Sequence, residues 1–233
     1  MQPEQLTAIF DQQAAGYDRQ AQRREPIENA LRFLLEAVFA DLPTNAHLLS
    51  VGSGTGTEVI ALAQRFPHWH FTLVEPSAGM VEVCRQNLIE AGVAERCFVE
   101  HGYLESVSPA KQFDAATCFL VSQFLVEPEK RKVFFRQIAQ RLKPQAPLAS
   151  SDLMFDTRLP MFEASLALWQ RITTGSPATI EQIERLKTAY TRDVGVLPFN
   201  AVAHLVKEAG FDEPLPFFQA GLVQAWVARR AAN

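Results

Sequence analysis

Three glycines at alternate positions, with an acid about 20 residues further on, are the residues whose types and spacing point most directly to chemistry. Gly52, Gly54 and Gly56 lie between an apolar run and a segment of helical spacing. Without a Cβ the chain can turn tightly there, and a ligand can lie against the main chain at the N-terminus of the helix. Glu75 ends the next apolar run, where a carboxylate can accept hydrogen bonds from both hydroxyls of a ribose. The two features together predict a nucleoside site.

The spacing excludes two better-known nucleotide loops. A dinucleotide-binding Gly-x-Gly-x-x-Gly loop needs a third glycine where this chain has Thr57, and a phosphate-binding loop needs Gly-Lys-Ser/Thr, which does not occur here. The alternative interpretation is a glycine-rich turn without a ligand.

The elements that must position these residues alternate along the chain. Short β-branched and aromatic runs predict strands, and helical periods lie between them. The predicted strands are His47–Val51, His70–Val74, Arg96–Glu100, Phe113–Val121, Pro147–Leu153, Leu215–Gln219 and Leu222–Ala228. The predicted helices between the early strands are Thr57–Arg65, Ser77–Ala91 and Pro128–Leu142. This alternation predicts an α/β fold with a seven-stranded, doubly wound, mostly parallel sheet.

Two helical stretches are left over, one at each side of the strand pattern. The first consists of two segments before the first strand, about Pro3–Ala14 and Pro26–Ala40, and the second covers roughly residues 159–209. Since there are no repeats or linkers, we expect residues 1–233 to form a single domain, with a helical cap made by residues 1–40 and about 159–209.

Composition limits the partners. Hydrophobic residues make up 48% of the chain and charged residues 21%, and the formal net charge is −4. An acidic surface repels phosphate backbones, so we expect no nucleic-acid partner. The short basic runs Arg23-Arg24 and Lys130-Arg131-Lys132 are interpreted as solvated helix faces.

The chain also lacks signals for a membrane or an oxidising compartment. No apolar stretch approaches the ~18 residues that span a bilayer, and no basic-then-apolar run follows Met1. Cys84, Cys97 and Cys118 have no zinc-like spacing, which indicates reduced core thiols. We therefore expect a cytoplasmic protein without a membrane partner or a metal site.

Several motifs resemble those of the class I S-adenosylmethionine (SAM)-dependent methyltransferases. The run at residues 51–56, Val-Gly-Ser-Gly-Thr-Gly, is similar to their first motif, and residues 74–80, Val-Glu-Pro-Ser-Ala-Gly-Met, to their second-strand motif. Residues 113–116 resemble the start of their fourth strand, and residues 134–144 the helix and turn before their fifth. The resemblance covers residues 48–152 well and the remainder loosely.

The resemblance implies SAM as cofactor and S-adenosylhomocysteine as product, with Glu75 on the ribose and Met80 against the adenine. The cofactor-binding residues it implies are Tyr17, Gly52, Ser53, Gly54, Gly56, Glu75, Pro76, Ser77, Met80, Gly102, Tyr103, Leu104, Phe119, Leu120 and Val121. Tyr17 belongs to a Tyr-Asp pair before the first strand that is common in this family.

The chain departs from the family pattern at three places. Ser50 stands where an acid is usual before the first glycine motif. Tyr103 stands where an aspartate often follows Gly102, and Gln145-Ala146 replaces two glycines. A subgroup resemblance, to carboxy-SAM synthases, rests on residues 122–125, 127–131 and 217–220.

The acceptor side carries fewer signals. Methyl transfer from a sulfonium is an in-line displacement that depends mainly on alignment, and a base is needed only for a nucleophile of high pKa. No compelling base is present, so the catalytic residues stay unassigned; His101 is the nearest candidate. Gln123, Trp169, Tyr190 and Arg192 are candidate substrate-pocket residues. Trp169 and Phe162 share an apolar stripe that is interpreted as core or homodimer interface, with a substrate wall as the alternative.

These features predict an enzyme that methylates a small molecule in an enclosed pocket. A carboxy-SAM synthase-like enzyme, with Lys187 or Arg192 holding the new carboxylate, and a non-catalytic SAM-binding module are the alternatives. The acceptor, its nucleophilic atom and the oligomeric state are not readable from the sequence.

Overall fold

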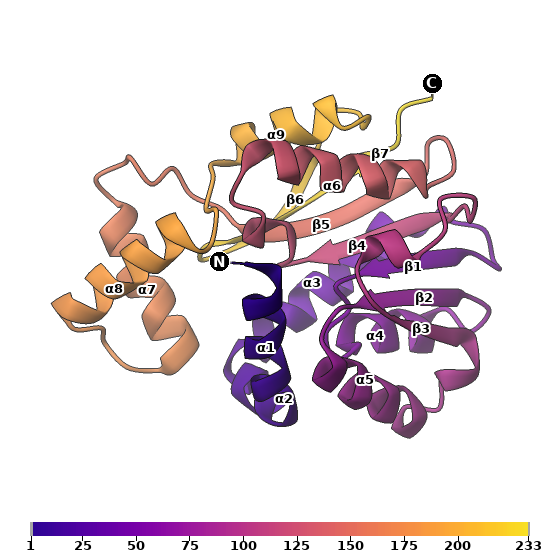
Figure 1. Cartoon of the computed structure of the whole chain (residues 1–233), viewed down its shortest axis with the longest axis horizontal. Coiled ribbons are helices and arrows are strands. Elements are labelled where there is room, and N and C mark those ends of the chain that lie inside the picture. Colours follow the sequence, from indigo (N-terminus) through magenta and orange to yellow (C-terminus); the bar gives the residue numbers. More distant parts are fainter. Residues whose placement is uncertain (1, 233) are drawn as a thin grey trace.

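The computed structural model describes residues 2–232, and a mixed sheet of seven strands runs through it (Figure 1). The strands are β1 (His47–Val51), β2 (His70–Glu75), β3 (Cys97–His101), β4 (Ala115–Phe119), β5 (Pro147–Leu153), β6 (Leu215–Ala220) and β7 (Val223–Arg229). Their order across the sheet is β3-β2-β1-β4-β5-β7-β6, with β7 antiparallel to both neighbours and the others parallel. The predicted α/β sheet is confirmed.

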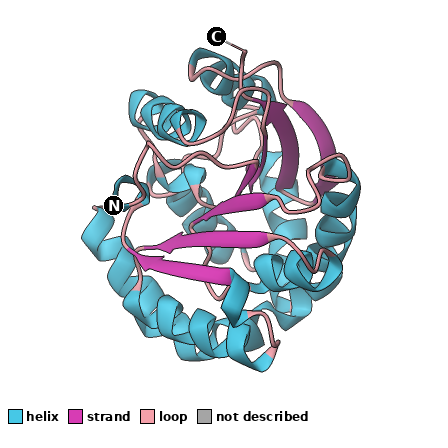
Figure 2. Cartoon of the chain, turned by 90° about the vertical axis from the view of Figure 1, so that its right-hand side faces the viewer, coloured by secondary structure: helices cyan, strands magenta, loops and turns pink. Residues whose placement is uncertain are grey.

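Helices cover both faces of the sheet (Figure 2). The helices are α1 (Pro3–Gln13), α2 (Tyr17–Ala21), α3 (Glu25–Val38), α4 (Thr57–Arg65), α5 (Ala78–Glu90), α6 (Pro128–Gln140), α7 (Phe162–Thr174), α8 (Ile180–Arg192) and α9 (Phe199–Glu208). Side chains of α3, α4 and α5 form one apolar core with the sheet, and those of α6 and α9 form the other. Parallel strands buried on both faces account for the continuous apolar runs in the sequence.

Several predicted boundaries differ from the structure by one to a few residues, and two of the differences have a clear local reason. The strand predicted at Phe113–Val121 is shorter in the structure, where β4 covers Ala115–Phe119. It ends at Phe119 because Leu120 has a φ of 57° and turns the chain out of the sheet. The predicted helix at Ser77 begins one residue later, because the Ser77 hydroxyl accepts a hydrogen bond from the Met80 N–H and caps the helix.

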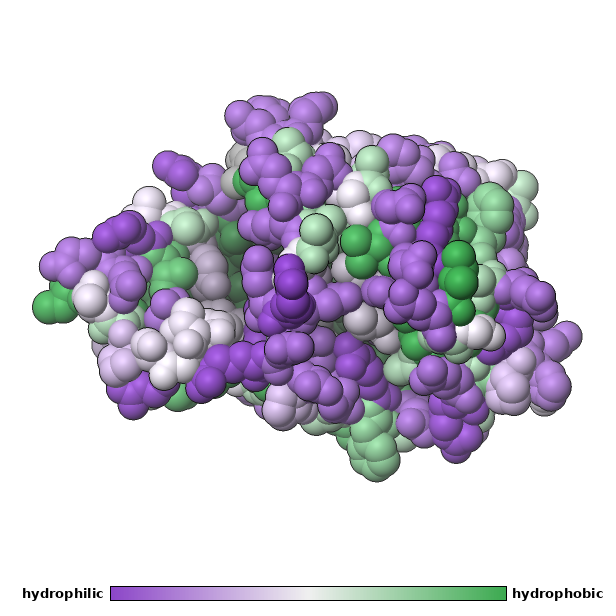
Figure 3. Space-filling model, turned by 90° about the horizontal axis from the view of Figure 1, so that it is seen from below, coloured by the Kyte–Doolittle hydropathy of each residue, from purple (hydrophilic) through white to green (hydrophobic). Residues whose placement is uncertain are grey.

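The cap is smaller than expected. Helices α7 and α8 project at the left of Figure 1, away from the rest of the molecule, and pack around Phe162, Leu166 and Trp169. Helix α9 packs instead on α6, with Val202 and Val206 in the sheet core. Only the segment up to Arg192 therefore stands away from the sheet. The same projection lies at the left of Figure 3, where the surface is mostly hydrophilic with separate apolar patches.

One basic run was interpreted wrongly. Arg131 is not on a solvated helix face: its side chain is 1% exposed and forms an ion pair with Asp152, which is 0% exposed. Its neighbour Lys130 is exposed, as expected, and pairs with Glu127. Arg131 precedes Phe135 by one helical turn and Ile138 by two, so it lies on the apolar stripe that faces the sheet.

Candidate cofactor and acceptor site

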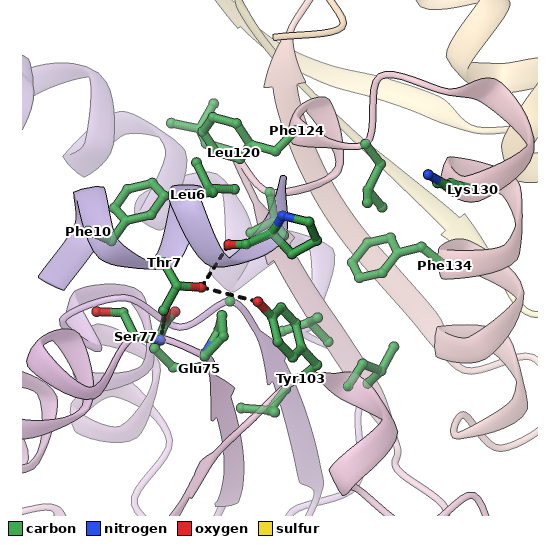
Figure 4. A pocket seen from close by; sticks show the side chains of 18 of the residues that line it. Leu6, Thr7, Phe10, Glu75, Ser77, Tyr103, Leu120, Phe124, Lys130 and Phe134 are labelled. Carbon is green, nitrogen blue, oxygen red and sulfur yellow. Dashed lines mark hydrogen bonds between the residues drawn. The ribbon is translucent and has the colours of Figure 1, made fainter. Parts of the chain in front are cut away.

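A cavity of about 820 Å³ lies at the carboxyl ends of β1, β2 and β4, beneath α1 (Figure 4). This is the edge at which open α/β sheets bind their ligands. Among the predicted cofactor residues, the lining contains Tyr17, Gly52, Gly54, Glu75, Pro76, Ser77, Met80, Gly102, Tyr103, Leu104, Phe119, Leu120 and Val121. The sequence-based set therefore falls almost entirely on one cavity.

Two loop residues of the predicted set stand behind the cavity instead. Gly56 is the N-cap residue that precedes α4 and has a φ of 81°, and a Cβ there would lie 2.8 Å from the Cys84 sulfur. Ser53 is buried, and its hydroxyl has no hydrogen-bond partner among the described residues. Gly56 thus closes the turn onto α5, whereas Ser53 carries an unused polar group next to the ligand site.

Glu75 is held at the cavity wall by the glycine loop and by the start of α5. Its Oε2 accepts the Gly54 N–H at 3.0 Å and its Oε1 accepts the Ser77 N–H at 3.0 Å. Burial raises the pKa of Glu75 above the ordinary value, and these two hydrogen bonds oppose that shift. Each carboxylate oxygen keeps a lone pair for a further donor, so both can accept ribose hydroxyls.

The glycine loop leaves room for a ligand at one position and none at another. A Cβ on Gly54 would meet nothing within 4 Å, whereas one on Gly52 would lie 2.4 Å from a Val121 methyl. The space over Gly54 and the carboxylate of Glu75 fit a nucleoside lying against the loop.

We expect Gly52→Ala to destabilise the protein far more than Gly92→Ala. Gly52 and Gly92 have φ values of 67° and 70°, so alanine costs about 1–2 kcal/mol at either for the left-handed backbone. Only at position 52 must the new methyl also displace Val121, which adds about 1–3 kcal/mol. Urea unfolding of both variants measures the difference, and equal midpoints would contradict the close approach.

Position 50 carries serine instead of the usual acid, and Glu58 of α4 brings a carboxyl group next to it. The Ser50 hydroxyl donates to Oε1 of Glu58 on α4 at 2.5 Å. Burial raises the pKa of Glu58, and the hydrogen bond from Ser50 opposes that shift. Glu58 therefore brings a carboxyl group to the base of the glycine loop, although it does not line the cavity.

The N-terminal helices form the roof. Leu6, Thr7 and Phe10 of α1 line the cavity, and the Thr7 hydroxyl lies 3.1 Å from the Tyr103 hydroxyl (Figure 4). Phe10 contacts Phe124 edge-on, with ring centroids 5.8 Å apart. Sequence reasoning anticipated a helical cap with Phe10 among its apolar residues, but it did not assign Leu6 or Thr7 to the cavity.

Of the four candidate substrate-pocket residues, only Arg192 lines the cavity. Gln123 is buried, and its Oε1 accepts the Leu153 N–H at 2.7 Å. The Trp169 indole donates to the Tyr190 hydroxyl at 3.1 Å within the cap core. The apolar stripe around Trp169 is thus core rather than substrate wall, because α8 and β7 cover it.

A buried polar network lies behind the cavity wall and was also missed. Asp152 accepts hydrogen bonds from the Ser122 hydroxyl at 2.7 Å and from the Gln123 N–H at 2.9 Å. Arg131 donates to the Ser122 hydroxyl and to the Gly195 carbonyl, both at 2.9 Å. The network joins the loop after β4 to the chain that leaves α8. The one sequence signal for this network was Asp152, an acidic residue within the buried strand β5.

No imidazole or thiol base is evident in the cavity. The lining contains no histidine or cysteine among the described residues, and the His101 ring instead lies 3.1 Å from the Pro76 carbonyl oxygen. Burial raises the pKa of Tyr17, so its hydroxyl stays protonated at neutral pH. The described residues also contain no group of three metal-ligating side chains.

SAM affinity should fall on acidification, beginning above the ordinary glutamate range of about 4.3. As pH falls through the raised pKa, Glu75 gains a proton and stops accepting from both hydroxyls. Asp11 and His101 are the charged or titratable groups nearby, and a hydrogen bond from Ser77 lowers the pKa of Asp11, which keeps it ionised. The folding stability of the SAM-free protein should change in the opposite direction and rise on acidification. Protonation of Glu75 removes a buried charge and so stabilises the fold.

Calorimetric titrations with SAM between roughly pH 7.5 and 5 measure this dependence. Glu75→Gln, which cannot ionise, should bind weakly and with little change over the same range. A wild-type affinity that stays constant down to the ordinary glutamate range would contradict the raised pKa.

Comparison with known proteins places this geometry in a class. Residues 48–145 match the family model of a methyltransferase domain. This match identifies residues 48–145 as a methyltransferase domain, the sheet order agrees with the class I SAM-dependent fold, and SAM is the cofactor. The domain match covers both the glycine loop and Glu75.

Three similar proteins illustrate the range of acceptors. A tRNA1(Val) (adenine(37)-N6)-methyltransferase of Pedobacter heparinus is 31% identical over 51% of this chain and 54% of its own length. A malonyl-[acyl-carrier protein] O-methyltransferase of Geobacter sulfurreducens is 34% identical over 34% and 28%. The structure of an O-methyltransferase family 2 protein from Planctomyces limnophilus with apigenin has a TM-score of 0.64 at 14% identity, covering 99% of this chain and 62% of that one. The chain thus spans less than two thirds of each relative.

Two further expectations can be compared with the structure. The three cysteines are free, as expected, and burial raises the pKa of Cys97 to about 11. Among residues 2–232, no helix has the length and apolar character needed to cross a membrane. A cytoplasmic location and homodimer formation stay predictions.

Proposed function

We propose that this protein transfers the methyl group of SAM to a small molecule enclosed beneath α1. The observation that carries the proposal is one continuous cavity, with Glu75 and the glycine loop on one side and apolar side chains of α1 and the loop after β4 on the other. Pockets of this size and mixed lining typically take small ligands.

The residues present divide the work by position. Gly54 and Glu75 would hold the ribose end of SAM, and Met80 would lie against the adenine. SAM supplies an electrophilic methyl group when bound. Leu6, Phe10 and Phe124 exclude water from the acceptor side, which favours an alignment-driven displacement in which the sulfonium charge disappears.

The absence of an evident base from the cavity restricts the acceptor. Tyr17 stays protonated at neutral pH, and three carboxylates of the lining are paired with cations: Glu127 with Lys130, Glu129 with Lys132 and Asp193 with Arg192. We infer that the acceptor atom carries no proton of high pKa when it meets the methyl group.

The rim of the cavity supports a small molecule rather than a nucleic acid. Glu105, Glu127 and Glu129 line the outer part, and the one lysine there, Lys130, is paired with Glu127 at 2.7 Å. A phosphate backbone would meet net negative charge at this opening. The tRNA methyltransferase of Pedobacter heparinus matches only 51% of this chain, so its similarity does not imply that this protein also acts on tRNA.

The carboxy-SAM alternative is less well supported. It requires a cation to hold a new carboxylate. Lys187 pairs with Glu163 at 2.5 Å and does not line the cavity. Arg192 does line it, but its guanidinium pairs with Asp193 at 2.7 Å.

Transfer of label from methyl-tritiated SAM tests the proposal. Purified protein is incubated separately with a low-molecular-weight cell extract and with bulk tRNA, and Glu75→Ala serves as the inactive control. We expect label in the small-molecule extract only. Label in tRNA would overturn the proposed acceptor class, and SAM binding with no labelled product in any fraction would favour the non-catalytic alternative.

A further inference from the structure

Helix α1 covers the cavity although none of its own residues is buried. Leu6, Thr7 and Phe10 point toward the cavity, and the outer face of the helix is exposed (Figure 4). A helix with so little buried surface is held by a small number of specific contacts, and such elements open most readily. The contacts that hold α1 therefore decide whether the cavity is closed.

The strongest polar contact of α1 is made by Asp11. Its Oδ1 accepts the Ser77 hydroxyl at 2.6 Å and the Gly79 N–H at 2.9 Å. Gly79 is in the first turn of α5, where a carboxylate is favoured by the helix dipole. The hydrogen bond from Ser77 lowers the pKa of Asp11, so the acceptor stays ionised at neutral pH.

Ser77 connects this contact to the ribose acid. Its side chain is buried, and its N–H donates to Oε1 of Glu75 at 3.0 Å. Ser77 thus donates to Asp11 through its hydroxyl and to Glu75 through its main chain. Asp11 itself does not line the cavity, so any effect it has on a ligand must pass through Ser77 or through α1.

Gly79 gives independent evidence that α1 packs closely against the start of α5. A Cβ at Gly79 would lie 3.1 Å from the Asp11 carbonyl oxygen and 3.2 Å from its Cα. Gly79 does not have a positive φ, so its own conformation does not require glycine. Glycine is required at this position because α1 approaches it so closely.

We propose that Asp11 is a positioning residue for the cofactor, which fixes α1 over the cavity and couples its closure to occupancy of Glu75. A ligand that orders Glu75 also orders Ser77, and Ser77 then holds Asp11. Closure of α1 in turn places Thr7 and Phe10 against the bound ligand. The inference rests on the proposed use of SAM and goes beyond it by assigning the contact that retains SAM.

Three single variants test the role of Asp11. Asp11→Ala removes both contacts, and Glu4→Ala removes an exposed acid from the same helix as a matched control. Asp11→Asn keeps Oδ1, the atom that accepts both hydrogen bonds. We expect SAM to dissociate about tenfold faster from Asp11→Ala, the size of one charge-assisted hydrogen bond partly replaced by water, and near the wild-type rate from the other two.

Gly79→Ala tests the same contact from the other side. Alanine favours the α5 helix itself, so a loss of SAM retention in this variant would come from displacement of α1. Stopped-flow dissociation and hydrogen exchange of residues 3–13, with and without SAM, are the measurements. We expect SAM to protect these amides in the wild type and much less in Asp11→Ala and Gly79→Ala, with β1 amides unchanged.

The outcomes separate this inference from the proposed function. A wild-type protein that binds no SAM would overturn the proposed function. A wild-type protein that binds SAM while Asp11→Ala matches Glu4→Ala in both dissociation rate and α1 exchange would overturn only the role of Asp11.

Discussion

Replacing Glu75 by alanine is expected to weaken SAM binding by at least about 100-fold. The carboxylate would accept two ribose hydroxyls, and a hydrogen bond to a charged acceptor contributes about 1.5–3 kcal/mol, of which water restores part. Each 1.4 kcal/mol corresponds to about tenfold in affinity. The Gly54 and Ser77 N–H groups also lose their acceptor, which loosens the loop that supports the ligand.

Calorimetry on three variants measures this effect. Glu75→Ala should show the full loss, and Glu75→Gln, which keeps one side-chain oxygen, a smaller one. Glu90→Ala removes an exposed carboxylate at the far end of α5, outside the cavity, and should bind like the wild type. Unchanged affinity in Glu75→Ala would remove Glu75 from the site.

Replacing Asp152 by alanine is expected to lower the free energy of unfolding by about 3–5 kcal/mol, the usual cost of leaving a buried charge without its partner. Arg131 would remain 1% exposed with its Asp152 ion pair gone. The Ser122 hydroxyl and the Gln123 N–H would also lose their acceptor. The loop after β4 and the chain after α8 would then be held less firmly around the acceptor side.

Urea unfolding separates this buried pair from an exposed pair one residue away. Glu127→Ala breaks the Lys130–Glu127 pair, whose side chains are 66% and 68% exposed, and should cost at most about 1 kcal/mol. A double variant, Asp152→Leu with Arg131→Met, should recover much of the loss, since it buries no unpaired charge. A cost for Asp152→Ala as small as that for Glu127→Ala would contradict the assignment.

The nucleoside half of the site was predictable because its signals are local. The glycines at 52, 54 and 56 fix a turn, and Glu75 ends the next strand, so one strand-helix-strand unit brings them together. The structure confirms this with the Gly54 N–H bonded to the Glu75 carboxylate at 3.0 Å. Main-chain conformation and a single crossover require no knowledge of distant segments.

The acceptor half was not predictable in the same way. Trp169 and Tyr190 were candidate pocket residues, yet they bond to each other inside the cap core. Arg131 was expected in solvent, yet it is buried against Asp152, 21 positions away in the printed sequence. Helical spacing gives the face on which a residue lies, but the packing partner of that face is decided by the other elements.

The sequence by itself therefore determined the positions of the strands in the cofactor half, the glycine turn and the acid at the tip of β2, because short-range geometry and apolar periodicity specify them. Only the tertiary structure decided that α1 lies over the cavity with Asp11 on Ser77, that Glu58 brings a carboxyl group to the place of the missing acid, and that α9 joins the sheet layers. These contacts join segments far apart in the chain or on different elements. They depend on which surfaces come together when the whole chain packs, and this cannot be predicted from a local sequence pattern.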